Sequence, residues 1–367
     1  MLAFIFSALT SLLVALLLLR YLHLHQHLTG DSHTQKPQKF HLGEIPRVGG
    51  IPIFVGILVG IIIQISISRV PLQIGFMWLI AVVPVFAAGL AEDLTKKVSG
   101  FWRLLASFVS AGIGCWLLDA VIIRLHIVGV DPLLAAFPWL AIVLTVFAVG
   151  GLCHALNLID GYNGLAGGVG VIILFALSYV AFTVNDSYVL RVCLVTTGAT
   201  IGFLVWNYPR GLIFAGDGGA YLLGFMIAEI SVLLVLRNPK VSPWFPFTLV
   251  MYPVWETLFT IYRRKFVRGM AAGLPDALHL HQMIFNRLVR WTVGTREIKS
   301  LRRRNSMTAP YLWGMGLLTV IPAMFFWKNT MALQSCCFLF IIIYVWLYRR
   351  IVRFKAPSWL MVHKNTD

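Results

Sequence analysis

Long apolar runs dominate the chain and set its expected architecture. Eleven runs come close to the roughly 20 residues that a membrane-spanning helix needs. They cover approximately 2–22, 48–68, 73–91, 102–123, 133–155, 165–184, 188–206, 218–236, 243–262, 308–327 and 331–348. The only long polar segments are 23–47 and 263–307, and no internal repeat interrupts the pattern. The sequence therefore predicts an all-α, polytopic membrane protein with about 11 transmembrane helices. We expect a single integral membrane domain, 1–367, with 263–307 as a long basic cytoplasmic loop.

Composition agrees with the apolar pattern and excludes several classes of protein. Hydrophobic residues make up 59% of the chain, charged residues only 12%, and the mean hydropathy is +0.83. A soluble domain usually carries about 25% charged residues. These values exclude a soluble enzyme, a nucleic-acid-binding protein and a disordered scaffold as descriptions of the whole chain.

The basic residues predict the orientation of the helices. The net charge is +16, which in a soluble protein would suggest nucleic acid as a partner. With the N-terminus outside, however, 24 of the 30 lysines and arginines fall on the cytoplasmic side of the eleven runs. Cytoplasmic loops of membrane proteins collect such residues. We therefore expect no nucleic-acid partner, membrane lipids as the surroundings, and a cytoplasmic C-terminus.

The scarce acidic residues gather on the same predicted face. Acids at a membrane edge are candidates for function because burying charge in lipid is unfavourable. In the predicted orientation, the cytoplasmic loops and helix ends carry Glu92, Asp93, Asp160 and Asp217, with Glu256 close to that surface. Acids beside many cations suit a phosphorylated substrate and a divalent metal. A transport path would instead place its polar groups near the middle of the membrane.

Each motif on this face also has a plain structural interpretation. The block from Glu92 to Lys96 could simply be a charged helix cap, and Arg47 an interfacial anchor. The segment from Asn157 through Asp160 to Asn163 could be a polar turn. Asp217, flanked by glycines, could cap a helix N-terminus, as Asp commonly does. The histidines at 279 and 281 could lie in a solvated loop. Five such signals from five separate loops on one face favour a shared site.

The motifs in their order resemble a known enzyme family. The motifs are Pro46-Arg47-Val48-Gly49-Gly50, Glu92-Asp93-x-x-Lys96, Asn157-x-x-Asp160-Gly161, Gly216-Asp217-x-Gly219 and His279-x-His281. Over about residues 40–290 they resemble the polyprenyl-phosphate N-acetylhexosamine-1-phosphate transferases of glycosyltransferase family 4. The resemblance implies an enzyme that transfers a sugar-1-phosphate from a UDP-N-acetyl sugar to undecaprenyl phosphate. The products would be the lipid diphosphate sugar and UMP, which would initiate a cell-envelope polysaccharide such as O-antigen.

The resemblance also implies the metal and the residues that handle phosphate. It implies Mg²⁺, with Mn²⁺ as an alternative, held by Asp217. Asp93 together with Glu92 would bind or deprotonate the lipid phosphate, and Lys96 would contact a phosphate. The implied location is the bacterial inner membrane, with the site facing the cytoplasm. A homo-oligomer is left open.

The remaining roles implied by the resemblance concern the nucleotide and the sugar. Asn157 and Asp160 would hold the nucleotide and the surroundings of the metal. His279 and His281 would contact the diphosphate or the sugar. Further substrate contacts are assigned to Arg47, Asn163, Glu256 and Arg264.

The sequence departs from the family pattern at four positions. Glu92 replaces the first acid of the usual Asp-Asp pair, and Asn163 stands where many members have a second Asp. Ala220 replaces a frequent Ser, and Gln282 replaces a frequent third His.

The missing three-histidine run disfavours a phospho-N-acetylmuramoyl-pentapeptide transferase, which stays as the alternative enzyme. A nucleotide-sugar transporter is the alternative from another class. UDP-N-acetylglucosamine is the default donor, with 6-deoxy-N-acetyl sugars as further options.

Overall fold

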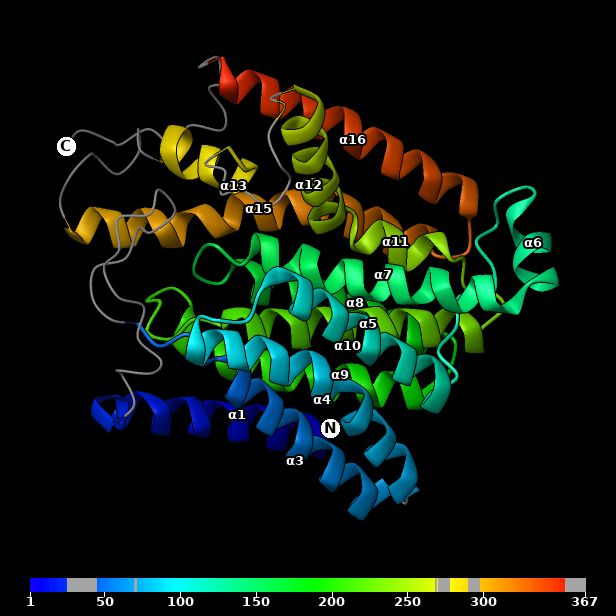
Figure 1. The fold of residues 1–367 in the computed structure, drawn as a ribbon, viewed down its shortest axis with the longest axis horizontal. Helices are drawn as coiled ribbons and strands as arrows, with labels where there is room; N and C mark the ends of the chain where they lie inside the picture. The colour runs from blue at the N-terminus through cyan, green and yellow to red at the C-terminus, as the bar shows by residue number, and fades with distance from the viewer. Residues whose placement is uncertain (25–44, 69–70, 268, 270–277, 290–297, 354–367) are drawn as a thin grey trace.

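The protein forms a bundle of long, roughly parallel helices (Figure 1). The computed structural model describes residues 1–24, 45–68, 71–267, 269, 278–289 and 298–353. The elements are α1 (Leu2–Arg20), α3 (Gly50–Ser68), α4 (Leu72–Thr95), α5 (Gly100–Leu117), α6 (Val130–Ala136), α7 (Pro138–Ile159), α8 (Leu165–Thr183), α9 (Ser187–Asn207), α10 (Gly216–Arg237), α11 (Trp244–Leu249), α12 (Met251–Tyr262), η1 (Arg263–Val267), α13 (Leu280–Met283), η2 (Ile284–Leu288), α15 (Ile298–Phe326) and α16 (Thr330–Val352).

The described helices confirm an all-α, multi-pass membrane protein. Ten of them are long and apolar enough to cross a membrane. Each of the ten corresponds to one of the eleven predicted runs. Many of their large apolar side chains are exposed, among them Phe147, Phe175 and Phe338, as expected for helices that face lipid tails.

Three predicted segments differ from the structure. The run 243–262 is not one helix but two short ones, α11 and α12, which meet at Val250, and α12 is steeply inclined to the bundle (Figure 1). The run 102–123 ends as a helix at Leu117, and the short helix α6 precedes α7. Finally, the described parts of 263–307 are not a loop, because they contain η1, α13, η2 and the first turns of α15.

Helix α10 forms the centre of the bundle. It packs against α4, α7 and α8, while α1 lies at the periphery against α3 and α9. Nearly all residues of α10 are buried, which explains why this run is apolar all round. Glycines allow the close approach at its start. A Cβ at Gly50 or at Gly89 would collide with the backbone of Gly219 or Gly218.

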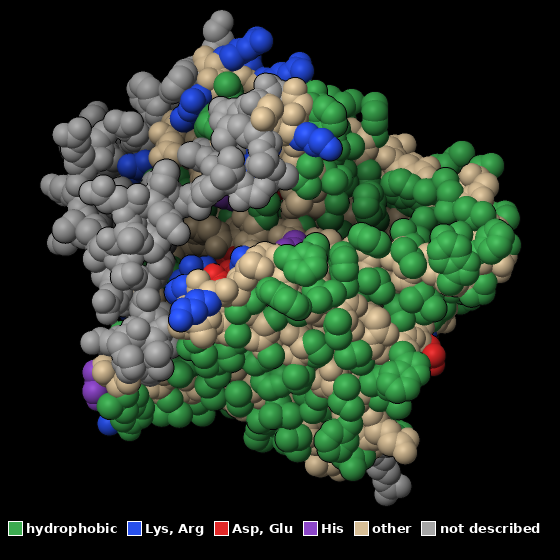
Figure 2. Space-filling view, in the orientation of Figure 1, with side chains coloured by type: hydrophobic (Ala, Val, Ile, Leu, Met, Phe, Trp, Pro, Cys, Tyr) green, Lys and Arg blue, Asp and Glu red, His purple; other side chains and the backbone are tan. Residues whose placement is uncertain are grey.

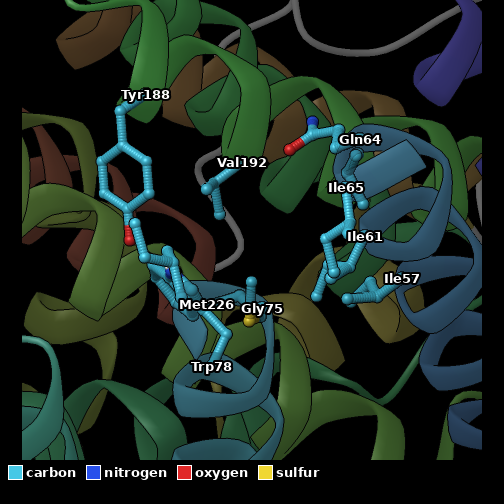
Figure 3. Close-up of a pocket in the computed structure, with 11 residues that line it drawn as sticks. Ile57, Ile61, Gln64, Ile65, Gly75, Trp78, Tyr188, Val192 and Met226 are labelled. Carbon is cyan, nitrogen blue, oxygen red and sulfur yellow. Dashed lines mark hydrogen bonds between the residues drawn. The ribbon is translucent and has the colours of Figure 1, made fainter. Parts of the chain in front are cut away.

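Two polar side chains between the helices, Trp78 and Gln64, have hydrogen-bond partners close by. Around a small pocket between α3, α4 and α9, the Trp78 indole N–H donates to the Tyr188 hydroxyl at 2.7 Å (Figure 3). The Gln64 amide donates to the carbonyl of Arg191 at 2.9 Å. The pocket measures about 20 Å³, which is room for roughly one water molecule. No substrate of the size implied by the sequence would fit there.

Candidate active site

Asp217, at the start of α10, is the centre of a cluster contributed by four elements. Its carboxylate accepts a hydrogen bond from the Asn157 side-chain amide, at the end of α7, at 3.0 Å. Arg103, in the first turn of α5, donates to its other oxygen. Arg47, before α3, forms an ion pair with it at 3.6 Å. The buried carboxylate is therefore balanced by two guanidinium groups, which are also suitable donors to phosphate.

The alternative interpretation of Asp217 as a helix cap is wrong. The N-cap position of α10 is Ala215, and the helix has no side-chain cap of its own. The capping oxygens come instead from Asp93. One accepts a hydrogen bond from the backbone N–H of Asp217 at 2.9 Å, and the other accepts from Gly218 at 2.8 Å. The side chain of Asp217 is thereby left to face the two arginines.

The geometry gives Asp93 a positioning role. Its side chain is only 1% exposed, and both of its oxygens accept backbone hydrogen bonds from the start of α10. A negative charge is favourable at a helix N-terminus. The interpretation that Asp93 itself binds or deprotonates the lipid phosphate stays a prediction beside this positioning role. Gly216 fits the same junction, since its φ of +69° suits glycine and a Cβ would collide with Asp93.

Glu92 and Lys96 close the end of α4. The Glu92 carboxylate accepts a hydrogen bond from the backbone N–H of Val98 at 2.8 Å. Lys96 adopts the left-handed conformation that ends the helix, and its ammonium group donates to the carbonyl of Asp93 at 2.6 Å. These contacts hold the block in place, and the exposed Lys96 lies beside Asp93 at the rim of the cluster.

Asp160 directly follows α7 and faces the same cluster. Burial raises the pKa of its carboxyl group to about 7, the negative charges of Asp217 and Asp93 add to the rise, and Arg47 opposes it. Within the described residues, its carboxylate has no hydrogen-bond partner. Asp160 is therefore an available carboxyl group next to Asp217, with a proton affinity suited to exchange near neutral pH.

A second cluster surrounds Glu256, on α12. Its carboxylate, 1% exposed, accepts hydrogen bonds from the Tyr344 hydroxyl at 2.6 Å and from the backbone N–H of Leu280 at 3.1 Å. The Nδ1 of His279 lies 3.3 Å from the same carboxylate, and its Nε2 lies 3.4 Å from Arg264. Glu256 thus positions the histidine segment, and its assignment to substrate binding stays a prediction.

His281 connects the two clusters. Its ring stacks on His279 with a centroid distance of 5.1 Å and meets the edge of Tyr162 at 5.5 Å. A Cβ placed on Gly161 would lie 3.5 Å from its Nε2. Burial, with His279 beside it, lowers the pKa of His281 to about 3, so the ring is neutral at pH 7. The histidines lie in a short helical segment, against the interpretation of a solvated loop.

Asn163 is placed differently from the other candidates. Its amide donates to the carbonyl of Pro209 at 3.1 Å, and its backbone N–H donates to the Asn305 side chain at 2.8 Å. These contacts tie the segment after α7 to the loop before α10 and to α15. A contribution to the fold of the site is therefore evident, whereas its assignment to substrate binding stays a prediction.

Sequence reasoning missed Arg103 as a member of the site. It entered the sequence argument only as one of the cytoplasmic charges. Its position did hold a signal, because it lies in the first turn of a predicted helix on the same face as the acids. In Figure 2, basic and acidic side chains meet in a hollow of the surface, and a histidine lies nearby.

The donor set fits Mg²⁺ when a phosphorylated substrate completes it. Among the described residues, no group of three or more His, Cys, Asp or Glu side chains could hold a metal ion. Mg²⁺, however, is usually bound by one or two protein carboxylates together with substrate phosphates and water. Asp217 and the unpartnered Asp160 supply that number of carboxylates. Carboxylate oxygens would suit Mn²⁺ as well.

A large apolar groove runs along the bundle, and its α7 and α12 walls include close sequence neighbours of these clusters. It has a volume of about 590 Å³ and lies between α7, α10, α11, α12 and the segment 121–127. On α7 it extends from Leu144 to Ala155, two residues before Asn157. On α12 it includes Thr257, next to Glu256. Its walls are almost entirely aliphatic and aromatic, so it suits a hydrocarbon chain rather than a sugar.

Comparisons with known proteins agree with this arrangement. The family model described as glycosyl transferase family 4 matches residues 75–235. A probable undecaprenyl-phosphate N-acetylglucosaminyl 1-phosphate transferase of Bacillus subtilis (strain 168) is 28% identical over 256 residues, 67% of each chain. A decaprenyl-phosphate N-acetylglucosaminephosphotransferase of Mycobacterium tuberculosis (strain ATCC 25618 / H37Rv) is 29% identical over 279 residues, 66% of each chain.

A third relative extends the similarity to enteric bacteria. The undecaprenyl-phosphate alpha-N-acetylglucosaminyl 1-phosphate transferase of Escherichia coli (strain K12) is 28% identical over 258 residues, 67% of each chain. These matches confirm the resemblance that the motifs indicated. By these matches the chain is similar to glycosyl transferase family 4 and to the polyprenyl-phosphate N-acetylhexosamine-1-phosphate transferases.

Proposed function

We propose that the protein transfers N-acetylhexosamine-1-phosphate from a UDP-sugar to undecaprenyl phosphate. An oxygen of the lipid phosphate attacks the β-phosphorus of the UDP-sugar and forms the new P–O bond. The bond between the β-phosphorus and the oxygen that bridges to the α-phosphate breaks. UMP leaves with that oxygen, and the product is the undecaprenyl diphosphate sugar. This lipid-linked sugar would start a cell-envelope polysaccharide.

The observation that carries the proposal is an apolar groove whose α7 wall ends two residues before Asn157, together with the Asp217 cluster at the end of the same helix. A polyprenyl phosphate has a long hydrocarbon tail and an anionic head, so its site must join an apolar channel to cationic donors. The groove offers about 590 Å³ of apolar space, and its α7 wall ends beside Asn157. Asn157 is hydrogen-bonded to Asp217, which two arginines surround. This combination supports a lipid phosphate better than a soluble sugar phosphate.

The residues of the chain would act mainly by positioning and by neutralising charge. Phosphoryl transfer needs little else from a protein. Arg47 and Arg103 would turn from Asp217 to the diphosphate oxygens when the UDP-sugar binds. Asp217 and Asp160 would hold Mg²⁺, which when bound would neutralise and orient the diphosphate. Asp93 would keep the start of α10 in place throughout.

The histidine segment would complete the donor side of the site. His279 is fixed by Glu256, and the neutral His281 lies beside Gly161, which directly follows Asp160. From there they would contact the diphosphate or the sugar. Arg264, next to His279, would add a positive charge at the same place.

The proposed sugar and lipid rest on the names of the relatives. The proposed orientation in the membrane rests on the distribution of lysines and arginines. The relatives act on N-acetylglucosamine phosphate according to their names, so UDP-N-acetylglucosamine is the proposed donor. Undecaprenyl phosphate is the proposed acceptor, although the mycobacterial relative uses decaprenyl phosphate. The proposed location is the bacterial inner membrane, with the Asp217 cluster at the cytoplasmic face, where lysines and arginines gather.

The test is a reconstituted reaction. Purified protein in detergent receives a panel of UDP-sugars with undecaprenyl phosphate and Mg²⁺, and UMP and the mass of the lipid product are measured. The proposal expects stoichiometric UMP and lipid diphosphate sugar, with UDP-N-acetylglucosamine as the preferred donor. UDP-sugar uptake into vesicles without UMP release would contradict it and favour a transporter. Preference for UDP-N-acetylmuramoyl-pentapeptide would favour the alternative enzyme.

A further inference from the structure

His154, one turn before Asn157 on α7, is a histidine that neither the motifs nor the mechanism has used. Its side chain is partly exposed, but its Nε2 atom is buried and has no hydrogen-bond partner within the described residues. A buried ring nitrogen without a partner is unfavourable, and such groups in native structures call for an explanation. A ligand oxygen at this position would satisfy it.

The position of His154 places it between the groove and the Asp217 cluster. Residues three apart on a helix share a face. Gly151, three residues before His154, lines the groove, and a Cβ there would meet nothing within 4 Å. Asn157, three residues after it, is hydrogen-bonded to Asp217. A phosphate that reaches Asp217 from the groove would therefore pass the ring of His154.

Packing holds the ring in this place. It lies against Tyr221 of α10, with a centroid distance of 4.8 Å and an interplanar angle of 53°. Tyr221 is itself buried and follows Asp217 by one helical turn, so the His154 ring packs against the same helix that carries the Asp217 carboxylate. If His154 had only a structural role, the contact with Tyr221 would be sufficient. The lack of a hydrogen-bond partner for Nε2 would then have no explanation.

We propose that Nε2 of His154 hydrogen-bonds the phosphate of the polyprenyl phosphate where it leaves the groove. The inference rests on the proposed function and adds to it a contact specific to the lipid substrate. The UDP-sugar, which lacks the hydrocarbon chain, would approach from the histidine and arginine side and would not contact His154.

The experiment compares three substitutions in the purified enzyme. In His154→Gln the side-chain amide reaches about as far as Nε2, whereas in His154→Asn it reaches only as far as Nδ1. His154→Phe keeps the contact with Tyr221 but removes both nitrogens. We expect His154→Asn and His154→Phe to raise the KM for undecaprenyl phosphate by about tenfold or more, as for a lost hydrogen bond to a charged group. The KM for the UDP-sugar should stay within about twofold, and His154→Gln should retain most of the affinity for the lipid.

The outcomes separate the inference from the proposed function. His23→Gln and His23→Phe are the matched controls, because His23 is exposed just after α1, which lies at the periphery of the bundle. A normal wild-type reaction with an unchanged lipid KM in His154→Phe would overturn the inference and leave the proposed function intact. Equal increases in both KM values would also overturn it, since that pattern indicates a structural effect. A wild-type protein without transferase activity would overturn both.

Discussion

Asp93 caps the helix that carries Asp217. Both carboxylate oxygens of Asp93 accept backbone hydrogen bonds, from Asp217 at 2.9 Å and from Gly218 at 2.8 Å. The acid at the end of α4 therefore fixes the start of α10, and the side chain of Asp217 is turned toward Arg47, Arg103 and Asn157. The two acids therefore differ: Asp93 supports the start of α10, whereas Asp217 is the carboxylate that we propose to hold the metal.

The first prediction concerns Asp93→Asn. The amide group would place N–H donors where a backbone N–H already points, so one hydrogen bond would be lost and one donor left unpaired. We expect a destabilisation of roughly 1–3 kcal/mol and a loss of turnover in which both substrates bind more weakly. Thermal unfolding in detergent and KM values for both substrates would test this. A stable variant that binds the UDP-sugar normally but not the lipid phosphate would instead make Asp93 a direct lipid contact.

Arg103 gives the second prediction. Its guanidinium group donates to Asp217, and we propose that it turns to the diphosphate when the UDP-sugar binds. Arg103→Ala should reduce kcat/KM by about a hundredfold, comparable to the loss of one charged donor from a phosphoryl-transfer site. Arg103→Lys keeps the charge but not the planar donor pair, so it should be intermediate. Arg191→Ala, on α9, is the control. Near-normal kcat/KM in Arg103→Ala would remove this residue from the chemistry.

The third prediction concerns the groove. Gly151 lines it, and a Cβ there would meet nothing within 4 Å, so we expect Gly151→Leu to narrow the groove. We expect a higher KM for undecaprenyl phosphate and a smaller effect on a short-chain lipid phosphate. Gly314→Leu on α15 is a matched control, since Gly314 also has nothing within 4 Å and does not line the groove. Equal effects of the two substitutions would argue against a lipid tail in the groove.

His281 predicts how stability depends on pH. Its pKa is lowered to about 3 by burial and by His279, whereas an exposed histidine titrates near 6.5. Between these values the unfolded chain binds a proton that the folded chain does not, so stability falls as the pH is lowered from about 6.5. The contribution approaches about 1.4 kcal/mol per pH unit. His281→Gln should flatten the pH dependence of thermal unfolding between pH 7 and 5. An unchanged slope would contradict the neutral, buried ring.

The fold was largely predictable because length and apolarity suffice to define a spanning helix. Length and apolarity do not show whether a run forms one continuous helix or two shorter ones. The run 243–262 breaks at Val250, and Pro253 explains part of this, since proline has no N–H to donate to the carbonyl four residues earlier. The basic composition of 263–307 suggested a loop. In the structure, Arg287 and Arg304 donate to the backbone carbonyls of Ile351 and Phe285, so these charges serve packing.

The site was predictable as a set of motifs but not in its internal connections. Sequence order placed Asp217, Asn157 and Arg47 on one face, and the structure joins them by hydrogen bonds and an ion pair. The sequence could not reveal that both carboxylate oxygens of Asp93 accept backbone hydrogen bonds, because the contact with Asp217 joins positions 124 residues apart. Arg103 was hidden for the same reason, since its partner is 114 residues away.

The activity of Asp217→Asn is the most direct test of whether this cluster performs phosphoryl transfer. Wild-type protein and Asp217→Asn are purified in parallel, and UMP release and the mass of the lipid product are followed across a Mg²⁺ titration. Because Asp93 provides the cap, we expect Asp217→Asn to unfold at nearly the wild-type temperature. Its rate should nevertheless fall by about a hundredfold, equivalent to roughly 2.7 kcal/mol of barrier, and additional Mg²⁺ should recover part of it. UMP release by Asp217→Asn at the wild-type rate and at ordinary Mg²⁺ would contradict the assignment.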